Sequence, residues 1–361
     1  MWRASMRLSL FEGTAEVGAV GRASQARTGI LYLQASDQEN NNELRGVPGR
    51  ALDRGSLHIR DAGHSQAQAK TAASKLMDLA SILKMQNRDG GWPYRQGGGS
   101  WTESTVFALM AQSVEKTDAQ SVERGFAWLQ AAQRRDGGWP PRPSVAQSTW
   151  VTAFVALLPR DGIGRSHHGR AVDWLMGQTG QETSLAYRLR SELMGNEALT
   201  AEARTGWPFF PGAAAWVSPT SISILALEKA RRYQNAGGIQ ARIETGRQFL
   251  LDRICRDGGW NYGRSNVLGV DAPSYPETTG QALLALNELQ SSKLGKALIA
   301  AQEQARQCQS AEGLSWLQLG LQAHGVVPVG PLRPLVARHV VDSALGILAK
   351  AALNGRNIFL E

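Results

Sequence analysis

The stretch that decides the fold is Gln133-Arg-Arg-Asp-Gly-Gly-Trp139, because it recurs along the chain. Gln86-Asn-Arg-Asp-Gly-Gly-Trp92 repeats it almost letter for letter, and Cys255-Arg-Asp-Gly-Gly-Trp260 repeats its second half. Two adjacent glycines permit a tight exit from a helix, and the tryptophan beside them supplies a large packing surface. Repetition at such intervals is typical of a fold made from stacked copies of one unit.

Each copy of the stretch lies between two apolar helical segments. Val122, Phe126 and Leu129 precede Gln133 at spacings of four and three, which places them on one face of a helix. After the Gly-Trp pair comes a loop with Pro or Gly, and then a second segment with helical periodicity. Each unit is therefore predicted to be a hairpin of two helices.

Two weaker copies extend the repeat through the rest of the chain. One starts at Arg170 and reaches its Gly-Trp pair only at Gly206-Trp207, and the other runs from Lys296 to Gly313-Leu-Ser-Trp316. One hairpin cannot bury its apolar face alone, so about six hairpins are expected to share a core. The sequence predicts an all-α fold over residues 71–361, closed into an α/α toroid with the second helices inside.

The first 70 residues have a different composition from the repeat region. They are rich in Gly, Ser, Gln, Asn and Arg, and they show no sustained helical or strand period. Such a segment buries too little apolar area to offset the entropy of ordering it. Residues 1–70 are predicted to be a disordered extension.

Composition narrows the classes of partner. The formal net charge is +8, but the basic residues are scattered and form no run of five or six, so we expect no nucleic-acid partner. The apolar runs fall short of the ~20 residues that span a bilayer, and the first eleven residues lack the apolar core of a signal peptide. These features predict a cytoplasmic protein, and the positive charge leaves a peripheral membrane contact open. The sequence contains no signal for the oligomeric state.

The chain has two cysteines, Cys255 and Cys308, which are too far apart in sequence for a disulfide framework or a zinc knuckle. Neither has Asp and His at the spacing of a zinc site. We expect no metal and no cofactor.

The segment Arg124-Gly-Phe-Ala-Trp-Leu129, followed by Gln133 and by Gly137-Gly-Trp139, resembles the QW motif of triterpene cyclases at every defining position. Other copies depart from it, since Ile254 stands where Gln is expected before Trp260. The resemblance is to the prenyltransferase/squalene oxidase repeat family, which includes squalene-hopene cyclases and protein prenyltransferase β subunits. It implies that the glutamines and tryptophans of the repeat tie outer helices together and carry no chemistry.

The Asp-x-Asp-Asp motif of hopene-cyclase-type enzymes is absent from the sequence. At the equivalent point of the repeat, the start of the second helix, stand Trp101-Thr-Glu103 and Tyr275-Pro-Glu277. The resemblance makes Glu277 and Glu103 the candidate catalytic acids, with Glu277 ahead.

A structural interpretation of the same two glutamates is better supported by the sequence. Ser100-x-x-Glu103 and Ser274-x-x-Glu277 both fit the capping box that begins a helix. A helix N-terminus also favours the ionised carboxylate, which cannot donate a proton. The sequence favours capping and leaves catalysis open.

Four aromatic residues near the starts of second helices are candidates for substrate binding. Aromatic faces there would hold an isoprenoid or stabilise a carbocation by cation–π attraction. The candidates are Trp101, Trp150, Trp216 and Tyr275.

Three functions remain open at this level. The resemblance implies an enzyme that binds or converts an isoprenoid or other apolar substrate in a central cavity. The alternative is a non-catalytic scaffold or binding module that keeps only the fold. A carbohydrate-active barrel would need a pair of carboxylates facing the cavity, for which Glu103 and Glu277 are the candidates.

Overall fold

The computed structural model describes residues 78–115, 119–181, 206–233, 237–267, 270–328 and 335–361. All of them lie in one compact unit, Gly63–Glu361. The predicted extension over residues 1–70 lies outside the described residues.

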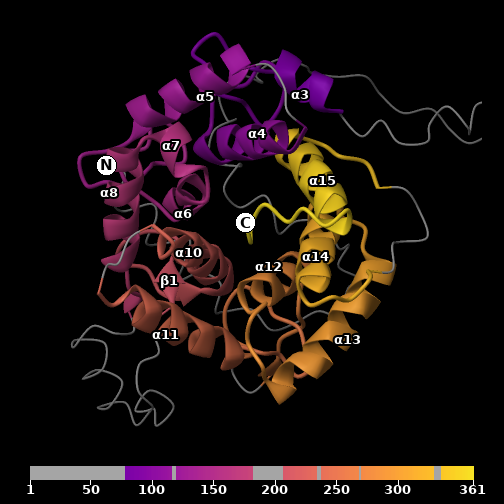
Figure 1. Cartoon of the computed structure of the whole chain (residues 1–361). Coiled ribbons are helices and arrows are strands. Elements are labelled where there is room, and N and C mark those ends of the chain that lie inside the picture. Colours follow the sequence, from indigo (N-terminus) through magenta and orange to yellow (C-terminus); the bar gives the residue numbers. More distant parts are fainter. Residues whose placement is uncertain (1–77, 116–118, 182–205, 234–236, 268–269, 329–334) are drawn as a thin grey trace, which may run out of the picture. The chain divides into compact units, whose positions relative to one another are not determined.

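Within these ranges an inner ring of six helices forms the centre of the unit. In ring order they are α4 (Thr102–Glu115), α6 (Val151–Ala156), α10 (Val217–Ala230), α12 (Pro276–Ala285), α14 (Ala311–Ala323) and α15 (Val340–Leu353). Each contacts the next, and α15 returns to contact α4, so the ring is closed (Figure 1). The predicted α/α toroid is confirmed.

A second layer of helices packs outside the ring (Figure 1). It consists of α3 (Leu79–Lys84), α5 (Ala119–Ala132), α8 (Arg165–Met176), α11 (Ile239–Leu251) and α13 (Ser292–Gln307). The short helix α7 (Arg160–Ile163) contacts α5 and α8. Two ribbons of two-residue strands lie in the loops: β1 (Trp207–Pro208) pairs antiparallel with β2 (Ala215–Trp216), and β3 (Asn266–Val267) pairs antiparallel with β4 (Val270–Asp271).

The weak copy predicted at Gly313-Leu-Ser-Trp316 is wrong. These residues lie inside α14, an inner helix, and do not form a turn between an outer and an inner helix. The outer helix α13 ends earlier, at Gln307, and α14 begins at Ala311, so Gly313 falls in the first turn of the inner helix. Trp316 instead packs in the core of the ring, with its ring centroid 6.1 Å from that of Phe107.

The two turns that contain the glutamine are held by the same contacts. In the turn ending at Trp139, the Gln133 amide donates to the carbonyls of Gly137 (2.8 Å) and His167 (2.9 Å). Gly137 has a φ of +93°, and a Cβ at this position would lie 2.6 Å from the carbonyl oxygen of Arg170. Only glycine fits, because the conformation is left-handed and the next outer helix lies against it.

The tryptophan of each turn joins an outer helix to an inner one. The Trp139 indole N–H donates to the carbonyl of Leu129 in α5 (2.7 Å), and its backbone N–H donates to the hydroxyl of Thr152 in α6 (2.8 Å). The equivalent indole and backbone bonds recur at Trp92, Trp207 and Trp260. These contacts agree with the structural role predicted for the repeat tryptophans.

All six inner helices start at the same end of the ring. Backbone N–H groups at four of these starts donate to the loop of a neighbouring repeat: Thr102 to Pro141, Trp150 to Phe209, Val217 to Tyr262 and Val340 to Tyr94. The last of these bonds, 3.0 Å long, joins the start of the last inner helix, α15, to the first repeat. We call this end of the ring, formed by the first residues of the inner helices and the loops before them, the N-terminal rim.

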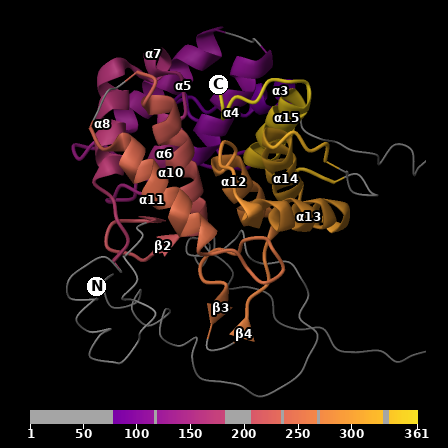
Figure 2. The same ribbon diagram turned by 60° about the horizontal axis from the view of Figure 1, so that its bottom comes forward.

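The opposite end of the ring is crossed by the last residues of the chain (Figures 1 and 2). The Lys229 ammonium donates to the carbonyl of Ile358 (2.9 Å), and the Asn357 amide donates to the side chain of Gln322 (2.9 Å). Phe359 is completely buried against Trp316, with ring centroids 5.3 Å apart. This segment therefore covers the packed centre of the ring at that end.

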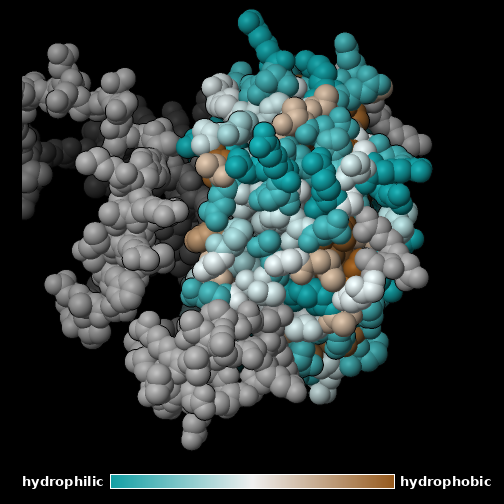
Figure 3. Space-filling model, turned by 90° about the vertical axis from the view of Figure 1, so that its left-hand side faces the viewer, coloured by the Kyte–Doolittle hydropathy of each residue, from teal (hydrophilic) through white to brown (hydrophobic). Residues whose placement is uncertain are grey.

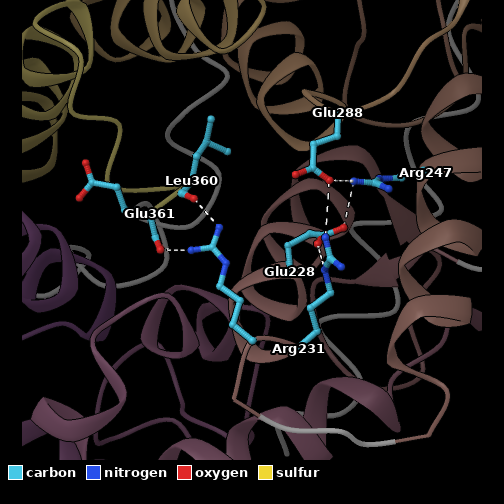
Figure 4. A network of polar contacts seen from close by, with 7 residues as sticks. Glu228, Arg231, Arg247, Glu288, Leu360 and Glu361 are labelled. Carbon is cyan, nitrogen blue, oxygen red and sulfur yellow. Dashed lines mark hydrogen bonds and ion pairs between the residues drawn. The ribbon is translucent and has the colours of Figure 1, made fainter.

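Ion pairs reinforce the same end on its outer side (Figure 4). Arg247 of α11 is buried and lies 2.9 Å from the Glu228 carboxylate of α10. Glu288, just after α12, lies 3.6 Å from both Arg231 and Arg247. The network links two successive repeats through α10, α11 and the end of α12.

The side of the ring that carries α8 is mostly hydrophilic (Figure 3). Among the described helices, none is both long and apolar enough to cross a membrane.

Candidate functional site

The first turns of the six inner helices lie together at the N-terminal rim. The second residue of each inner helix, in ring order, is Glu103, Thr152, Ser218, Glu277, Glu312 and Val341. Three of the six are glutamates. Glu103 and Glu277, the two candidates from the resemblance, therefore have a third counterpart, Glu312, at the same position of α14.

Four carboxylates lie on four successive inner helices and form what we call the acidic arc: Glu277, Glu312, Asp342 and Glu103. Glu277 lies against Gly313, the neighbour of Glu312 in α14, since a Cβ on Gly313 would be 2.8 Å from Oε1 of Glu277. Glu312 and Asp342 approach within 4.8 Å of each other. Burial raises the pKa of Glu312 well above its ordinary value, and the charges of Glu277, Glu103 and Asp342 raise it further. Its environment favours the protonated acid.

Glu103 stands at the end of the acidic arc and is paired with a tyrosine. The Tyr94 hydroxyl donates a hydrogen bond to Oε2 of Glu103. Burial raises the pKa of Glu103, although the bond from Tyr94 acts in the opposite direction. Desolvation of Glu103 therefore opposes the ionised carboxylate that a helix N-terminus favours.

The predicted capping boxes are wrong at both serines. The Ser100 hydroxyl donates to the Asp89 carboxylate (2.7 Å), and the Ser274 hydroxyl donates to that of Asp257 (2.9 Å). The residue that precedes α12 is Tyr275, which makes no side-chain capping bond. The serines are drawn to the aspartates of the repeated turns, so capping does not account for Glu103 or Glu277.

His339 and Asp342 form a dyad beside Glu312. Nδ1 of His339 accepts the backbone N–H of Asp342 (3.3 Å), and its Nε2 lies 3.4 Å from Oδ1 of Asp342. The other oxygen of Asp342 accepts the backbone N–H of Arg338 (2.8 Å). Burial lowers the pKa of His339, which favours the neutral ring.

Glu312, His339 and Asp342 also have the residue types of a divalent-cation site, with ligand atoms within 4.8 Å of one another. Because Nδ1 of His339 accepts a hydrogen bond, the proton of the neutral ring is on Nε2, the atom that faces Asp342. A metal bound through Nε2 would need the opposite tautomer. The geometry fits a cluster that shares protons, and the absence of a metal stays a prediction.

Aromatic side chains occupy the part of the rim opposite Glu312 and Asp342. We call Trp150, Phe209 and Trp216 the aromatic arc. The ring centroid of Phe209 lies 5.2 Å from that of Trp150 and 5.8 Å from that of Trp216. All three side chains are half-buried. Trp150 also contacts Phe154 (5.0 Å), which leads into the buried aromatic core.

The four aromatic residues predicted to bind substrate all lie on the rim, immediately before inner helices. Trp150 and Trp216 belong to the aromatic arc. Trp101 packs against Tyr94 (5.3 Å between centroids) beside the acidic arc, and Tyr275 packs against Tyr262 (5.4 Å). Each is half-buried, so part of each ring remains accessible.

Sequence reasoning missed Glu312, Asp342, His339 and Tyr94. One signal for Glu312 was present: Ser310-Ala-Glu312 has the same spacing as Tyr275-Pro-Glu277, with the glutamate second in the helix. It was hidden because the neighbouring Gly313 was assigned to a turn.

No protein-family model and no curated protein matches the chain significantly. Among solved structures, the type II terpene cyclase MstE from Scytonema is similar, with 13% identity, a TM-score of 0.45, and coverage of 78% of this chain and 77% of the cyclase. The GH76A alpha-1,6-mannanase from Salegentibacter sp. HEL1_6 has 9% identity, a TM-score of 0.49, and coverage of 76% and 98%. The family 8 endoglucanase Cel10 from Klebsiella pneumoniae has 13% identity, a TM-score of 0.45, and coverage of 74% and 96%. At these values no activity is transferred to this chain.

Proposed function

We propose that the protein is an enzyme that converts an isoprenoid or similarly apolar substrate, with Glu312 as the acid that starts the reaction. The observation that carries the proposal is the position of Glu312 among three other carboxylates, on the opposite side of the rim from the aromatic arc. Glu103 and Glu277, the acids favoured by the resemblance, then act as its neighbours.

The acidic arc suits a reaction that passes through a carbocation. Glu312 transfers its proton to a double bond or an oxygen of the substrate, and the positive charge then develops on carbon. The neighbouring carboxylates stabilise that charge electrostatically. Loss of a proton from the cation to a carboxylate ends the reaction without any change of oxidation state.

The aromatic arc supports an apolar substrate. Trp150, Phe209 and Trp216 present half-buried rings at the rim, and such rings bind hydrocarbon chains through area burial. Ring faces also attract a cation held against them. The same three side chains therefore serve for substrate binding and for stabilising the cation.

The test is to incubate the purified full-length protein with squalene, geranylgeraniol and geranylgeranyl diphosphate and to search for products by mass spectrometry. Glu312→Gln should lower the turnover number at least about a hundredfold, since removal of a general acid typically costs 10²–10⁴. Glu303→Gln is the matched control, because Glu303 is exposed on α13 and, among the residues that the structure describes, pairs with Arg306 and Gln307 of the same helix. Unchanged turnover in Glu312→Gln would refute the role of Glu312. Failure of all three compounds to bind the wild-type protein would favour a non-catalytic scaffold.

A carbohydrate-active enzyme is the second candidate, because the acidic arc brings more than one carboxyl group to a single rim. Glycoside hydrolysis needs an acid and a second carboxylate on either side of the scissile bond. Release of reducing ends from a panel of β-glucans and mannans, lost in both Glu312→Gln and Glu277→Gln, would favour this function over the first.

A further inference from the structure

Trp316 of α14 lies one helical turn after Glu312, on the same face of the helix. Side chains in a helix lean toward its N-terminus, so the indole extends from its own backbone toward Glu312. The indole N–H is fully buried, and the described residues offer it no well-formed hydrogen bond. Burial and the three other carboxylates of the acidic arc raise the pKa of Glu312, and this N–H acts in the opposite direction. The position of the indole therefore acts on the acid.

The Trp316 side chain is held in place by its neighbours. Its backbone is fixed against α12, because a Cβ on Gly280 would lie 2.2 Å from the carbonyl carbon of Trp316. Its ring centroid lies 6.1 Å from that of Phe107 and 5.3 Å from that of Phe359. All three rings are fully buried, and side chains in such a close-packed centre have a single position. The indole is thus held between Phe107 of α4 and Phe359.

Phe359 belongs to residues 356–361, which cross the end of the ring opposite the N-terminal rim (Figure 1) and which we call the crossing segment. Several inner helices hold this segment. The Arg232 guanidinium, just after α10, donates to the carbonyl of Leu360 (2.6 Å; Figure 4). The Arg356 guanidinium donates to a carbonyl of α4 (2.9 Å). These bonds, with those already described from α10 and α14, fix the Phe359 ring against Trp316.

We propose that Phe359 is a positioning residue for Glu312 and that it acts through Trp316, from the opposite end of the ring. Without the Phe359 ring, the indole settles into the vacated space and its N–H moves away from the carboxyl group. The acid then loses a neighbouring donor, so it holds its proton more tightly and transfers it less readily. The inference rests on the proposed function for the role of Glu312 as the acid.

The direct measurement is the pKa of Glu312 in the full-length protein, followed by NMR of its side-chain carboxyl carbon. The resonance is assigned by its absence from Glu312→Gln. Phe359→Ala should raise this pKa by about half a pH unit or more, because a carboxyl group that loses a hydrogen-bond donor becomes less acidic. An unchanged pKa in Phe359→Ala would overturn the inference.

A matched control opens a cavity away from the acidic arc. Phe249 of α11 is also fully buried and packs against Gly206, in the turn before α10. Phe249→Ala should destabilise the protein to a similar extent and leave the pKa of Glu312 unchanged. An equal rise of the pKa in both variants would mean that a loosened core is responsible, and would overturn the inference.

Benzene should reverse the effect of Phe359→Ala, because an apolar cavity of this kind binds it. With benzene bound, the indole is again supported from the side that Phe359 occupied. The pKa of Glu312 should return toward its value in the wild-type protein. A benzene-bound variant whose pKa stays raised would contradict the positioning role.

A cycle of single and double substitutions tests the route through Trp316. Trp316→Phe keeps a ring and removes the N–H, so it should itself raise the pKa of Glu312. Phe359→Ala should then cause no further rise in the Trp316→Phe background. A second rise as large as in the wild-type background would show that Phe359 acts by another route, and the inference would fail. If Phe359→Ala does not fold, Phe359→Leu replaces it, with a smaller rise expected and with no rise counting equally against the inference.

Turnover separates this inference from the proposed function. For an isoprenoid that the wild-type protein converts, Phe359→Ala should lower the turnover number at least about threefold and leave KM within about twofold, because the aromatic arc is intact. If the pKa of Glu312 moves as expected and no isoprenoid is converted, the positioning of Glu312 stands and the proposed function fails. If an isoprenoid is converted and neither the pKa nor the turnover number changes in Phe359→Ala, the proposed function stands and the positioning role fails.

Discussion

Trp139 and Trp150 belong to the same repeat, yet their surroundings differ completely. Trp139 is fully buried in a turn, where its two N–H groups bond to α5 and α6. Trp150 is half-buried on the N-terminal rim and packs against other aromatic rings. The turns contain nearly the same residues in each clear copy, whereas equivalent rim positions differ from helix to helix. The repeated turns therefore fix how the helices pack, and the repeats differ in the side chains that they place on the N-terminal rim.

The largest expected effect comes from the two tryptophans themselves. Trp139→Ala should lower the free energy of unfolding by about 3–5 kcal/mol, since it leaves a cavity at a fully buried site. Trp150→Ala should cost about 1–2 kcal/mol, because the side chain is half-buried and the site can rehydrate. Urea denaturation measures both. Equal losses of unfolding free energy in the two variants would contradict the distinction between the turn and the rim.

A second pair of substitutions tests why glycine is needed in the turns. Gly137→Ala should cost about 2–4 kcal/mol, because the left-handed φ is unfavourable and the new Cβ meets the Arg170 carbonyl. Gly97 also has a positive φ (+81°), but no atom lies within 4 Å of a Cβ there. Gly97→Ala should therefore cost only about 1–2 kcal/mol. A larger loss at Gly97 than at Gly137 in the same denaturation experiment would contradict the packing explanation.

The hydroxyl that links a turn to its inner helix should have a smaller effect. Thr152→Val removes the acceptor of the Trp139 backbone N–H without changing the volume of the side chain, and should cost about 1–2 kcal/mol. Thr245→Val, at a half-buried position on α11 where the hydroxyl bonds only within its own helix, to the Ala241 carbonyl, is the control and should cost less than about 0.5 kcal/mol. Thermal melting of both variants provides the comparison, and similar losses would mean that the bond contributes nothing.

The smallest effect on stability is expected at the rim and depends on pH. The pKa of Glu312 is raised in the folded protein, so the folded state holds this proton more tightly than the unfolded chain does, where the pKa is about 4.3. Its stabilising contribution is present below that value and is lost as the pH rises toward the folded pKa. Between pH 4 and pH 7 the wild-type protein should therefore lose stability relative to Glu312→Gln. Urea midpoints across this range measure the difference, and parallel curves would show that the folded pKa is ordinary.

The local sequence predicted most of the fold, but only some of the residues on the N-terminal rim. Glu103 and Glu277 were located because each follows a clear turn at a fixed distance. The capping role predicted for them is wrong because Ser100 and Ser274 bond to aspartates in the preceding turns. The capping pattern considers only residues around the helix start, so it could not indicate these competing aspartates. Glu312 follows no such turn, and its helix was misassigned for that reason.

By itself the sequence determined the turns and the toroid, because a turn depends on a few adjacent residues: glycines that accept a left-handed φ, and a tryptophan beside them. Only the tertiary structure decided which acids meet. Glu103 and Asp342 lie in the first and last inner helices, and they belong to one arc because the ring closes through the bond from Val340 to Tyr94. Burial then gives Glu312 a raised pKa, and burial comes from the whole ring.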